Sequence, residues 1–333
     1  MSKADQKPNK EMSNVNYVFG PVPSRRLGRS LGIDLVPFKT CTYDCIYCQL
    51  GRTTNQTLER KQYVPAELVI QQLKERLSTL STPPDFITLS GSGEPTLNSQ
   101  IGWVIDKVNK ITSIPVAVLT NGSLLHLEPV REALLSADLI IPSLDAASPP
   151  LFRFINRPHH SLRLSLMLQG LREFRREYAG QIWLEIMLCG GFNDEPQEIK
   201  RLREEIEKIG PDRIQLNTVV RPPAEDFAYP LNTEELEKIR ALFGGRAEVL
   251  PRACSAPAIR VYGQIDGEIL SLLERRPCSL EDLSLAFGLP EEKLAECLQE
   301  LRGKGRVGFN IHNHTVFYKA QRVPEKNLTI ARL

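Results

Sequence analysis

The chain has 333 residues, 41% of them hydrophobic and 25% charged, which is the composition of a globular protein with one large or one large and one small domain. The 42 basic residues nearly balance the 40 acidic ones, so the net charge of +2 does not identify a nucleic-acid partner. No apolar run is long enough to span a membrane, and residues 1–16 lack the apolar centre of a signal peptide. We therefore expect a cytoplasmic protein with reduced cysteines and a disordered N-terminal tail over residues 1–16.

Short strand-like runs alternate with amphipathic helical patterns over residues 17–250. The runs expected to form strands are 32–36, 86–89, 115–119, 139–143, 182–187 and 213–219. Between the first two, Val69, Leu73 and Leu77 recur every fourth residue and mark one face of a helix, and further helices are expected at 162–178 and 195–209. This alternation predicts an α/β fold with a parallel sheet, as a long open sheet or a partial barrel, whose active groups lie where the strands end.

Three cysteines follow the first expected strand in a C-x3-C-x2-C pattern: Cys41, Cys45 and Cys48. Three thiolates on one loop can hold three corners of a [4Fe–4S] cluster and leave the fourth iron open. Since clusters that only carry electrons are usually closed by four cysteines, an open iron indicates chemistry at the metal. A zinc site fits less well because the other cysteines form no second pair, and disulfides fit poorly because seven is odd.

The second expected strand ends in a glycine-rich turn formed by Gly91, Ser92, Gly93 and Glu94. Glycines let a ligand approach the backbone closely, and the Glu94 carboxylate can accept hydrogen bonds from an ammonium group. A phosphate loop is the obvious alternative, but the sequence contains no G-x4-G-K-[ST] pattern.

Together, the cysteine motif with Tyr47 before its last cysteine and the G-x-G-E-P turn resemble the radical S-adenosylmethionine (SAM) enzymes, over residues 17–250. The resemblance implies a partial (β/α)6 barrel in which Cys41, Cys45 and Cys48 ligate the cluster and SAM chelates its open iron. It also implies that the reduced cluster cleaves SAM to a 5′-deoxyadenosyl radical, which abstracts hydrogen from a substrate. The cluster would be reduced by a low-potential electron donor such as flavodoxin or ferredoxin.

The resemblance also implies roles for individual residues. Tyr47 would lie near the adenine of SAM, and Gly91, Ser92, Gly93 and Glu94 would meet its amine. Later strand ends add Asn121, Ser143, Asp145 and Asn217, with Ser143 or Asp145 at the ribose and Asn217 at the adenine or the substrate. Alternatively, Asn121 only forms a turn and Asp145 only caps a helix. Cys189, after the fifth strand, is either a hydrogen-atom donor to a substrate radical or a small core residue.

The stretch from Gly20 to Pro37 resembles a narrower group, the radical SAM proteins related to the wyosine tRNA-base synthase. No cysteine precedes Cys41 to hold that synthase's second cluster, so the radical chemistry is expected to carry over but not the substrate. Basic residues also gather around the cysteine motif, namely Arg25, Arg26, Arg29, Lys39 and Arg52. They indicate an anionic substrate or cofactor, although ordinary surface charge explains them equally well.

The pattern changes after residue 250. Residues 251–261 are expected to be a linker, followed by helices at 265–274, 279–287 and 290–302 and a hairpin at 307–311 and 315–318. These elements predict a small winged helix-turn-helix domain over residues 262–320 and a tail over 321–333. The third helix carries four glutamates and two basic residues, so the basic footprint of a DNA reader is missing.

Two alternatives to a radical SAM enzyme remain open from the sequence. One is an iron–sulfur regulator that senses redox state and binds nucleic acid through the winged helix. The other is an activase that places a radical on a partner protein. The substrate of an enzyme would be tRNA, a nucleotide or a protein, and the sequence does not choose among them.

Overall fold

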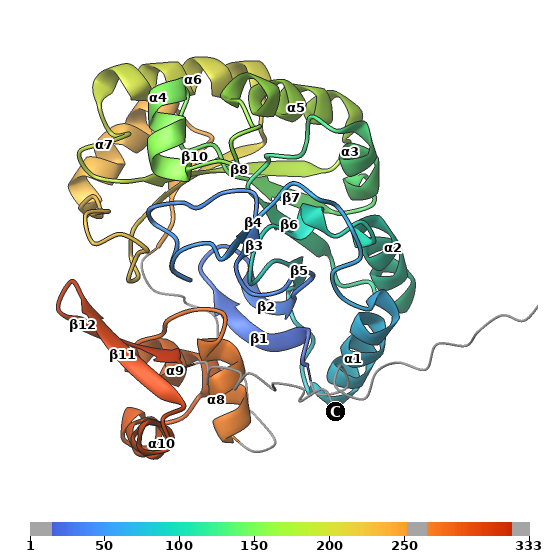
Figure 1. Cartoon of the computed structure of the whole chain (residues 1–333), viewed down its shortest axis with the longest axis vertical. Coiled ribbons are helices and arrows are strands. Elements are labelled where there is room, and N and C mark those ends of the chain that lie inside the picture. The colour runs from blue at the N-terminus through green and yellow to red at the C-terminus, as the bar shows by residue number, and fades with distance from the viewer. Residues whose placement is uncertain (1–14, 252–264, 322–333) are drawn as a thin grey trace, which may run out of the picture.

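A computed structural model describes residues 15–251 and 265–321. An eight-stranded sheet in the order β1-β2-β5-β6-β7-β8-β9-β10 forms its centre (Figure 1). Its strands are β1 (Val18–Ser24), β2 (Gly28–Ile33), β5 (Phe86–Leu89), β6 (Val116–Thr120), β7 (Leu139–Pro142), β8 (Gln181–Leu188), β9 (Arg213–Thr218) and β10 (Ala247–Val249). Only β1 runs antiparallel to its neighbour, so the fold is α/β with a mostly parallel sheet, as expected.

Helices cover the outer side of the curved sheet (Figure 1). They are α1 (Ala66–Thr79), α2 (Ile101–Ile111), α3 (Glu128–Leu134), α5 (Leu164–Glu177), α6 (Pro196–Ile209) and α7 (Thr233–Phe243). Shorter elements are η2 (Pro95–Leu97), α4 (Pro149–Leu151), the π-helical η3 (Phe152–Asn156) and the small pair β3 (Thr40–Cys41) and β4 (Asn55–Gln56). In α1 the periodic residues Val69 and Leu73 are fully buried, because one apolar face of the helix packs on the sheet.

The first expected strand is displaced in the structure. Residues 32–36 were predicted to form it, whereas β2 covers Gly28–Ile33 and residues 34–36 belong to the following loop. The reason is β1, which the sequence pattern did not reveal and which pairs along β2. Pro21 and Pro23 make β1 read as a non-strand, but prolines are tolerated at the edge of a sheet, where β1 lies.

The described C-terminal residues, 265–321, form a separate apolar core, and we call them the C-terminal domain. Its elements are α8 (Ile265–Leu273), α9 (Leu280–Phe287), α10 (Glu291–Gly303) and the hairpin of β11 (Val307–His312) and β12 (Thr315–Ala320). These elements form where the sequence predicted helices and a hairpin, and assignment to the winged-helix class stays a prediction.

The C-terminal domain packs against β1 of the sheet domain (residues 15–251) (Figure 1). Val22 of β1 contacts the apolar core of the C-terminal domain. An ion pair of 2.9 Å joins Arg76 on α1 to Glu268 on α8. The linker expected at 251–261 and the tails expected at 1–16 and 321–333 lie outside the described residues, apart from residues 15, 16, 251 and 321. Across the described ranges, no helix is both long and apolar enough to cross a membrane.

Candidate active site

A cavity of about 410 Å³ lies on the inner side of the sheet and extends to the C-terminal domain. It is lined by the loop after β2 that carries Cys41, Cys45 and Cys48, which we call the cysteine loop. The ends of β5, β6 and β9, the β1–β2 turn and the segment between α8 and α9 also line it. The predicted site residues in its wall are Cys41, Cys45, Tyr47, Cys48, Gly91, Gly93, Glu94, Asn121, Ser143 and Asn217. Ser92, Asp145 and Cys189 were also predicted to take part, but they do not line the cavity.

The cysteine loop is docked onto the glycine-rich turn by backbone hydrogen bonds. The Lys39 amide donates to the Ser92 carbonyl at 2.6 Å, and the Glu94 amide donates to the Thr40 carbonyl at 3.1 Å. Ser92 also donates its amide, at 3.0 Å, and its hydroxyl to the buried Asp34 carboxylate. Ser92 therefore joins the turn to the loop, which explains why it faces away from the cavity.

Both glycines of the turn are required by this docking. Gly91 has φ +134°, and a Cβ there would lie 2.8 Å from Cγ of Asp34. A Cβ on Gly93 would lie 1.9 Å from the Thr40 carbonyl oxygen. From the sequence, the glycines were expected to let a ligand approach the backbone. In the structure, they let the cysteine loop and the residues before it approach the turn.

Each of the three cysteine sulfurs has a side-chain hydrogen-bond donor. Lys39 Nζ lies 3.1 Å from Cys48 Sγ, Asn121 Nδ2 lies 3.6 Å from Cys41 Sγ, and Asn156 Nδ2 lies 3.6 Å from Cys45 Sγ. Burial raises the pKa of the Cys41 thiol to about 12, and it raises that of Cys45 well above its usual value. The donors favour thiolates at this position, as in an iron–sulfur site whose sulfurs accept hydrogen bonds.

The arrangement fits a cluster better than a single ion. Among the described residues, no three His, Cys, Asp or Glu side chains lie close enough to share one metal ion. In a [4Fe–4S] cluster each cysteine binds a different iron, so its three thiolates need not converge on one point. The free thiols and their donors are therefore compatible with such a cluster.

Glu94 is almost fully buried and ties the turn to β6. Its carboxylate accepts from the amide (3.1 Å) and hydroxyl (2.6 Å) of Thr96, the hydroxyl of Thr120 (2.6 Å) and the amide of Asn121 (2.7 Å). Burial raises its pKa, and these four donors act in the opposite direction. Because a carboxylate has about four acceptor sites, a SAM amine would compete with these donors for Glu94.

Asp145 lies outside the cavity lining and binds residues of the site. Its carboxylate accepts from the Tyr47 hydroxyl at 2.5 Å, from Asn156 Nδ2 at 2.7 Å and from the Met187 amide at 2.9 Å. Burial raises the pKa of Asp145 to about 6. Of the two residues predicted for the SAM ribose, only Ser143 lines the cavity, and Asp145 instead holds Tyr47 and Asn156 in place.

Comparison with known proteins decides the family. The sequence model of the Radical SAM superfamily matches residues 35–217, more than half of the chain. The chain belongs to the radical SAM superfamily. A UPF0026 protein of Methanocaldococcus jannaschii is 35% identical over 303 residues, covering 91% of this chain and 91% of that protein.

A second relative is longer than this chain. A Brachyspira hyodysenteriae protein described as GTPase Obg is 38% identical over 317 residues, which are 94% of this chain but 46% of that protein. Among solved structures, a radical SAM methyltransferase from Sphaerobacter thermophilus superposes with a TM-score of 0.50. It is 18% identical and covers 66% of this chain and 65% of the methyltransferase, so it shows the shared fold alone.

Enzymes of the radical SAM superfamily use a [4Fe–4S] cluster and SAM. In this member of the family, Cys189 is separate from the cavity that holds the three motif cysteines. It is fully buried and packs with Ile46, Ile155 and Val219, and burial raises the pKa of its thiol. The core interpretation of Cys189 fits this packing, and the hydrogen-donor interpretation has no geometric support.

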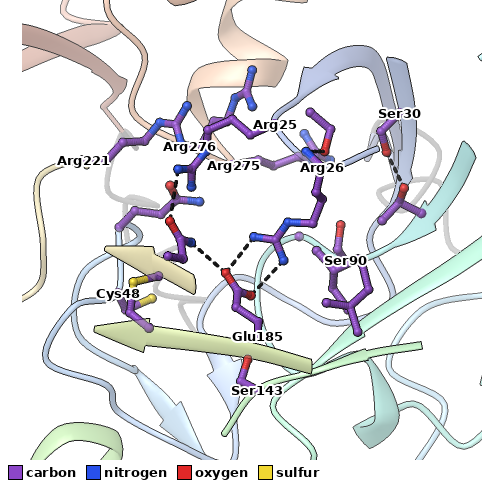
Figure 2. A pocket seen from close by; sticks show the side chains of 18 of the residues that line it. Arg25, Arg26, Ser30, Cys48, Ser90, Ser143, Glu185, Arg221, Arg275 and Arg276 are labelled. Carbon is purple, nitrogen blue, oxygen red and sulfur yellow. Dashed lines mark hydrogen bonds and ion pairs between the residues drawn. The ribbon is translucent and has the colours of Figure 1, made fainter. Parts of the chain in front are cut away.

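Two polar residues in the site of this radical SAM protein were not predicted from the sequence. Asn156 reaches both Cys45 and Asp145 from the π-helical η3, and no sequence pattern marked it. Glu185 lines the cavity and accepts two hydrogen bonds from Arg26, at 2.8 and 2.7 Å (Figure 2). Burial would raise the pKa of Glu185, but Arg26 and Asn217 hold it below its usual value. A lone carboxylate inside the apolar run 182–187 was a usable signal.

Proposed function

We propose that the chain is a radical SAM enzyme that reductively cleaves SAM to a 5′-deoxyadenosyl radical, which abstracts hydrogen from a substrate held in the same cavity. The observation that supports this most strongly is the set of donors around the motif sulfurs, from Lys39, Asn121 and Asn156. Superfamily membership favours an enzyme over the regulator alternative.

In this proposal Cys41, Cys45 and Cys48 hold the [4Fe–4S] cluster. When the cluster is bound, it supplies the electron for SAM cleavage. The side chains that line the space beside them are Tyr47, Asn121, Ser143 and Asn217, and these would contact SAM or the substrate. Gly91 and Gly93 keep the turn close to the cysteine loop, and Glu94 fixes the position of Asn121.

The proposal also covers the class of reaction, the cellular location, the electron donor and the substrate. The enzyme would be of the oxidoreductase or transferase type and would act in the cytoplasm, where its cysteines stay reduced. A flavodoxin or ferredoxin would reduce its cluster. The substrate would be a tRNA base or a nucleotide, and the C-terminal domain, for which the sequence predicts a winged helix, would present it.

The test is SAM cleavage by purified, cluster-loaded protein under anaerobic conditions with dithionite. Wild-type protein should form 5′-deoxyadenosine, and Cys45→Ala should reduce both the bound iron and the rate by at least about 100-fold, since a lost ligand removes the cluster. Cys297→Ala is the matched control, because Cys297 lies on α10 and outside the cavity wall. Unchanged iron content and an unchanged rate in Cys45→Ala would overturn the proposal.

A further inference from the structure

One side of the cavity is lined by arginines. The described residues contribute five: Arg25 and Arg26 from the β1–β2 turn, Arg221 after β9, and Arg275 and Arg276 between α8 and α9. Figure 2 shows them along one side of the pocket, with Cys48 and Ser143 toward the other. Segments from both domains therefore bring guanidinium groups to one surface of the cavity.

Three of these arginines have carboxylate partners. Arg26 pairs with Glu185 at 2.7 Å, Arg221 pairs with Asp282 at 3.4 Å, and Arg275 pairs with Asp34 at 3.6 Å. Of these carboxylates, only that of Glu185 belongs to the cavity wall. The positive charge of this wall is thus only partly balanced within the cavity.

The other two arginines form no ion pair with a described residue. Arg25 donates to Asn217 Oδ1 at 3.1 Å and to the Pro251 carbonyl at 3.4 Å. Arg276 donates to the Pro23 carbonyl at 3.0 Å, and its buried Nε has no hydrogen-bond partner. Partly buried cationic groups without an acid partner are costly, and a bound anion would offset that cost.

The arginines also act on one another. Burial, together with the neighbouring Arg221 and Arg26, lowers the pKa of Arg25 to about 10. Burial and the neighbouring Arg276 lower the pKa of Arg221, whose side chain is 11% exposed. The side chains of Arg25, Arg221 and Arg276 line the same side of the cavity (Figure 2), and the lowered pKa values of Arg25 and Arg221 fit a partly dehydrated place.

We propose that Arg25, Arg221 and Arg276 form a subsite that binds a phosphate group of the substrate, between the sheet domain and the C-terminal domain. The proposal deepens the proposed function, on which it rests for the existence of a substrate in this cavity. It assigns the C-terminal domain a direct part in substrate binding, because Arg276 belongs to that domain.

Phosphate fits this subsite better than the other anions that could enter. A carboxylate is planar and is matched by one guanidinium fork, as Arg26 matches Glu185. A phosphate group presents several acceptor oxygens in a tetrahedral arrangement and can receive forks from several directions. SAM carries a sulfonium and an amine beside its single carboxylate, so a wall of arginines would repel it.

The test measures binding to cluster-loaded protein by anaerobic titration calorimetry. The probes are inorganic pyrophosphate, malonate as a dicarboxylate, and a single-stranded oligouridylate. We expect pyrophosphate to bind more tightly than malonate, and Arg276→Gln and Arg25→Gln each to weaken pyrophosphate binding by about tenfold, the effect of losing one charged hydrogen-bonding group. Tighter binding of the oligouridylate than of pyrophosphate would identify an RNA phosphodiester as the source, and the reverse order would identify a small phosphorylated molecule.

Controls separate charge, folding and SAM binding. Arg302→Gln removes the same charge from α10, outside the cavity, and should leave pyrophosphate binding unchanged. Arg276→Lys keeps the charge but removes the guanidinium fork, so it should still weaken pyrophosphate binding. The iron content and the circular dichroism spectrum of each variant should match those of the wild type, which shows that the variant is folded. The subsite is disproved if pyrophosphate does not bind, if malonate binds equally well, or if SAM affinity falls as much as pyrophosphate affinity. Failure of wild-type protein to make 5′-deoxyadenosine would instead count against the proposed function alone.

Discussion

The two walls of the cavity differ in how their polar groups are satisfied. On the cysteine side, the sulfurs have donors, Glu94 accepts four hydrogen bonds, and Asp145 accepts three. On the arginine side, Arg25 and Arg276 reach only an amide and backbone carbonyls. The polar groups of the first wall are satisfied within the protein, whereas two guanidinium groups of the second lack a carboxylate partner among the described residues.

The largest effect is expected from a substitution that disrupts the cysteine side of the cavity, which we call the cysteine wall. In Gly93→Ala the new Cβ would collide with the Thr40 carbonyl, at 1.9 Å, so the cysteine loop must move away from the turn. We expect bound iron to fall to about a tenth of the wild-type content or less, because the three thiolates lose their common position. Iron and sulfide analysis after reconstitution measures this effect.

Gly303→Ala is the matched control for that change. Gly303 ends α10, and a Cβ there meets nothing within 4 Å. Its iron content should equal that of the wild type. If Gly93→Ala also bound iron normally, the docking of the loop on the turn would not be what positions the cysteines.

A smaller effect is expected from removing the one carboxylate on the arginine wall. Glu185→Gln leaves Arg26 buried without a charged partner, and it should lower the free energy of unfolding by about 3 kcal/mol, as for other broken buried pairs. Since Arg26 holds the pKa of Glu185 below its usual value, this stability is present at neutral pH. It is lost as the pH falls through the depressed pKa of the folded state, so the difference between variant and wild type should shrink there.

Urea unfolding at neutral and acidic pH measures both parts of the Glu185 prediction. Glu234→Gln serves as the control, because Glu234 is 78% exposed and pairs with the exposed Lys238 on α7. That change should cost less than about 1 kcal/mol. If the free energy of unfolding fell equally in the two variants, the ion pair of Glu185 with Arg26 would contribute no more to stability than an exposed pair.

The smallest effect concerns one donor on the cysteine wall. Thr120→Val keeps the shape of the side chain but removes the 2.6 Å hydrogen bond to Glu94. It should lower the free energy of unfolding by about 1 to 2 kcal/mol, because a buried carboxylate loses one of four donors. The same change at the exposed Thr79 of α1 should have little effect, and a loss as large there would argue against a special role for Thr120.

The cysteine wall could be predicted from the sequence because each of its parts is a short continuous segment. The cysteine motif and the glycine-rich turn each lie on one loop, and the apolar runs at 86–89 and 213–219 became β5 and β9 nearly as predicted. The sequence could not show that Asp145 lies behind Tyr47, since this depends on how η3 brings in Asn156.

The arginine wall is assembled by tertiary structure. Of the basic residues that the sequence places around the cysteine motif, Arg25 and Arg26 belong to the wall. Arg29 instead contacts Asp85 and the Pro83 carbonyl. Nothing in the sequence linked Arg25 with Arg276, because their proximity depends on β1, the strand that its prolines concealed.

The contact of Val22 with the core of the C-terminal domain limits how these two parts can be exchanged between proteins. Val22 completes an apolar core that belongs to another segment of the chain, and the same strand leads directly into Arg25 and Arg26. A chimera that carries the C-terminal domain of a distant relative would therefore need a matching β1 to remain folded. Recombination between members of the family should succeed only when both pieces are inherited together.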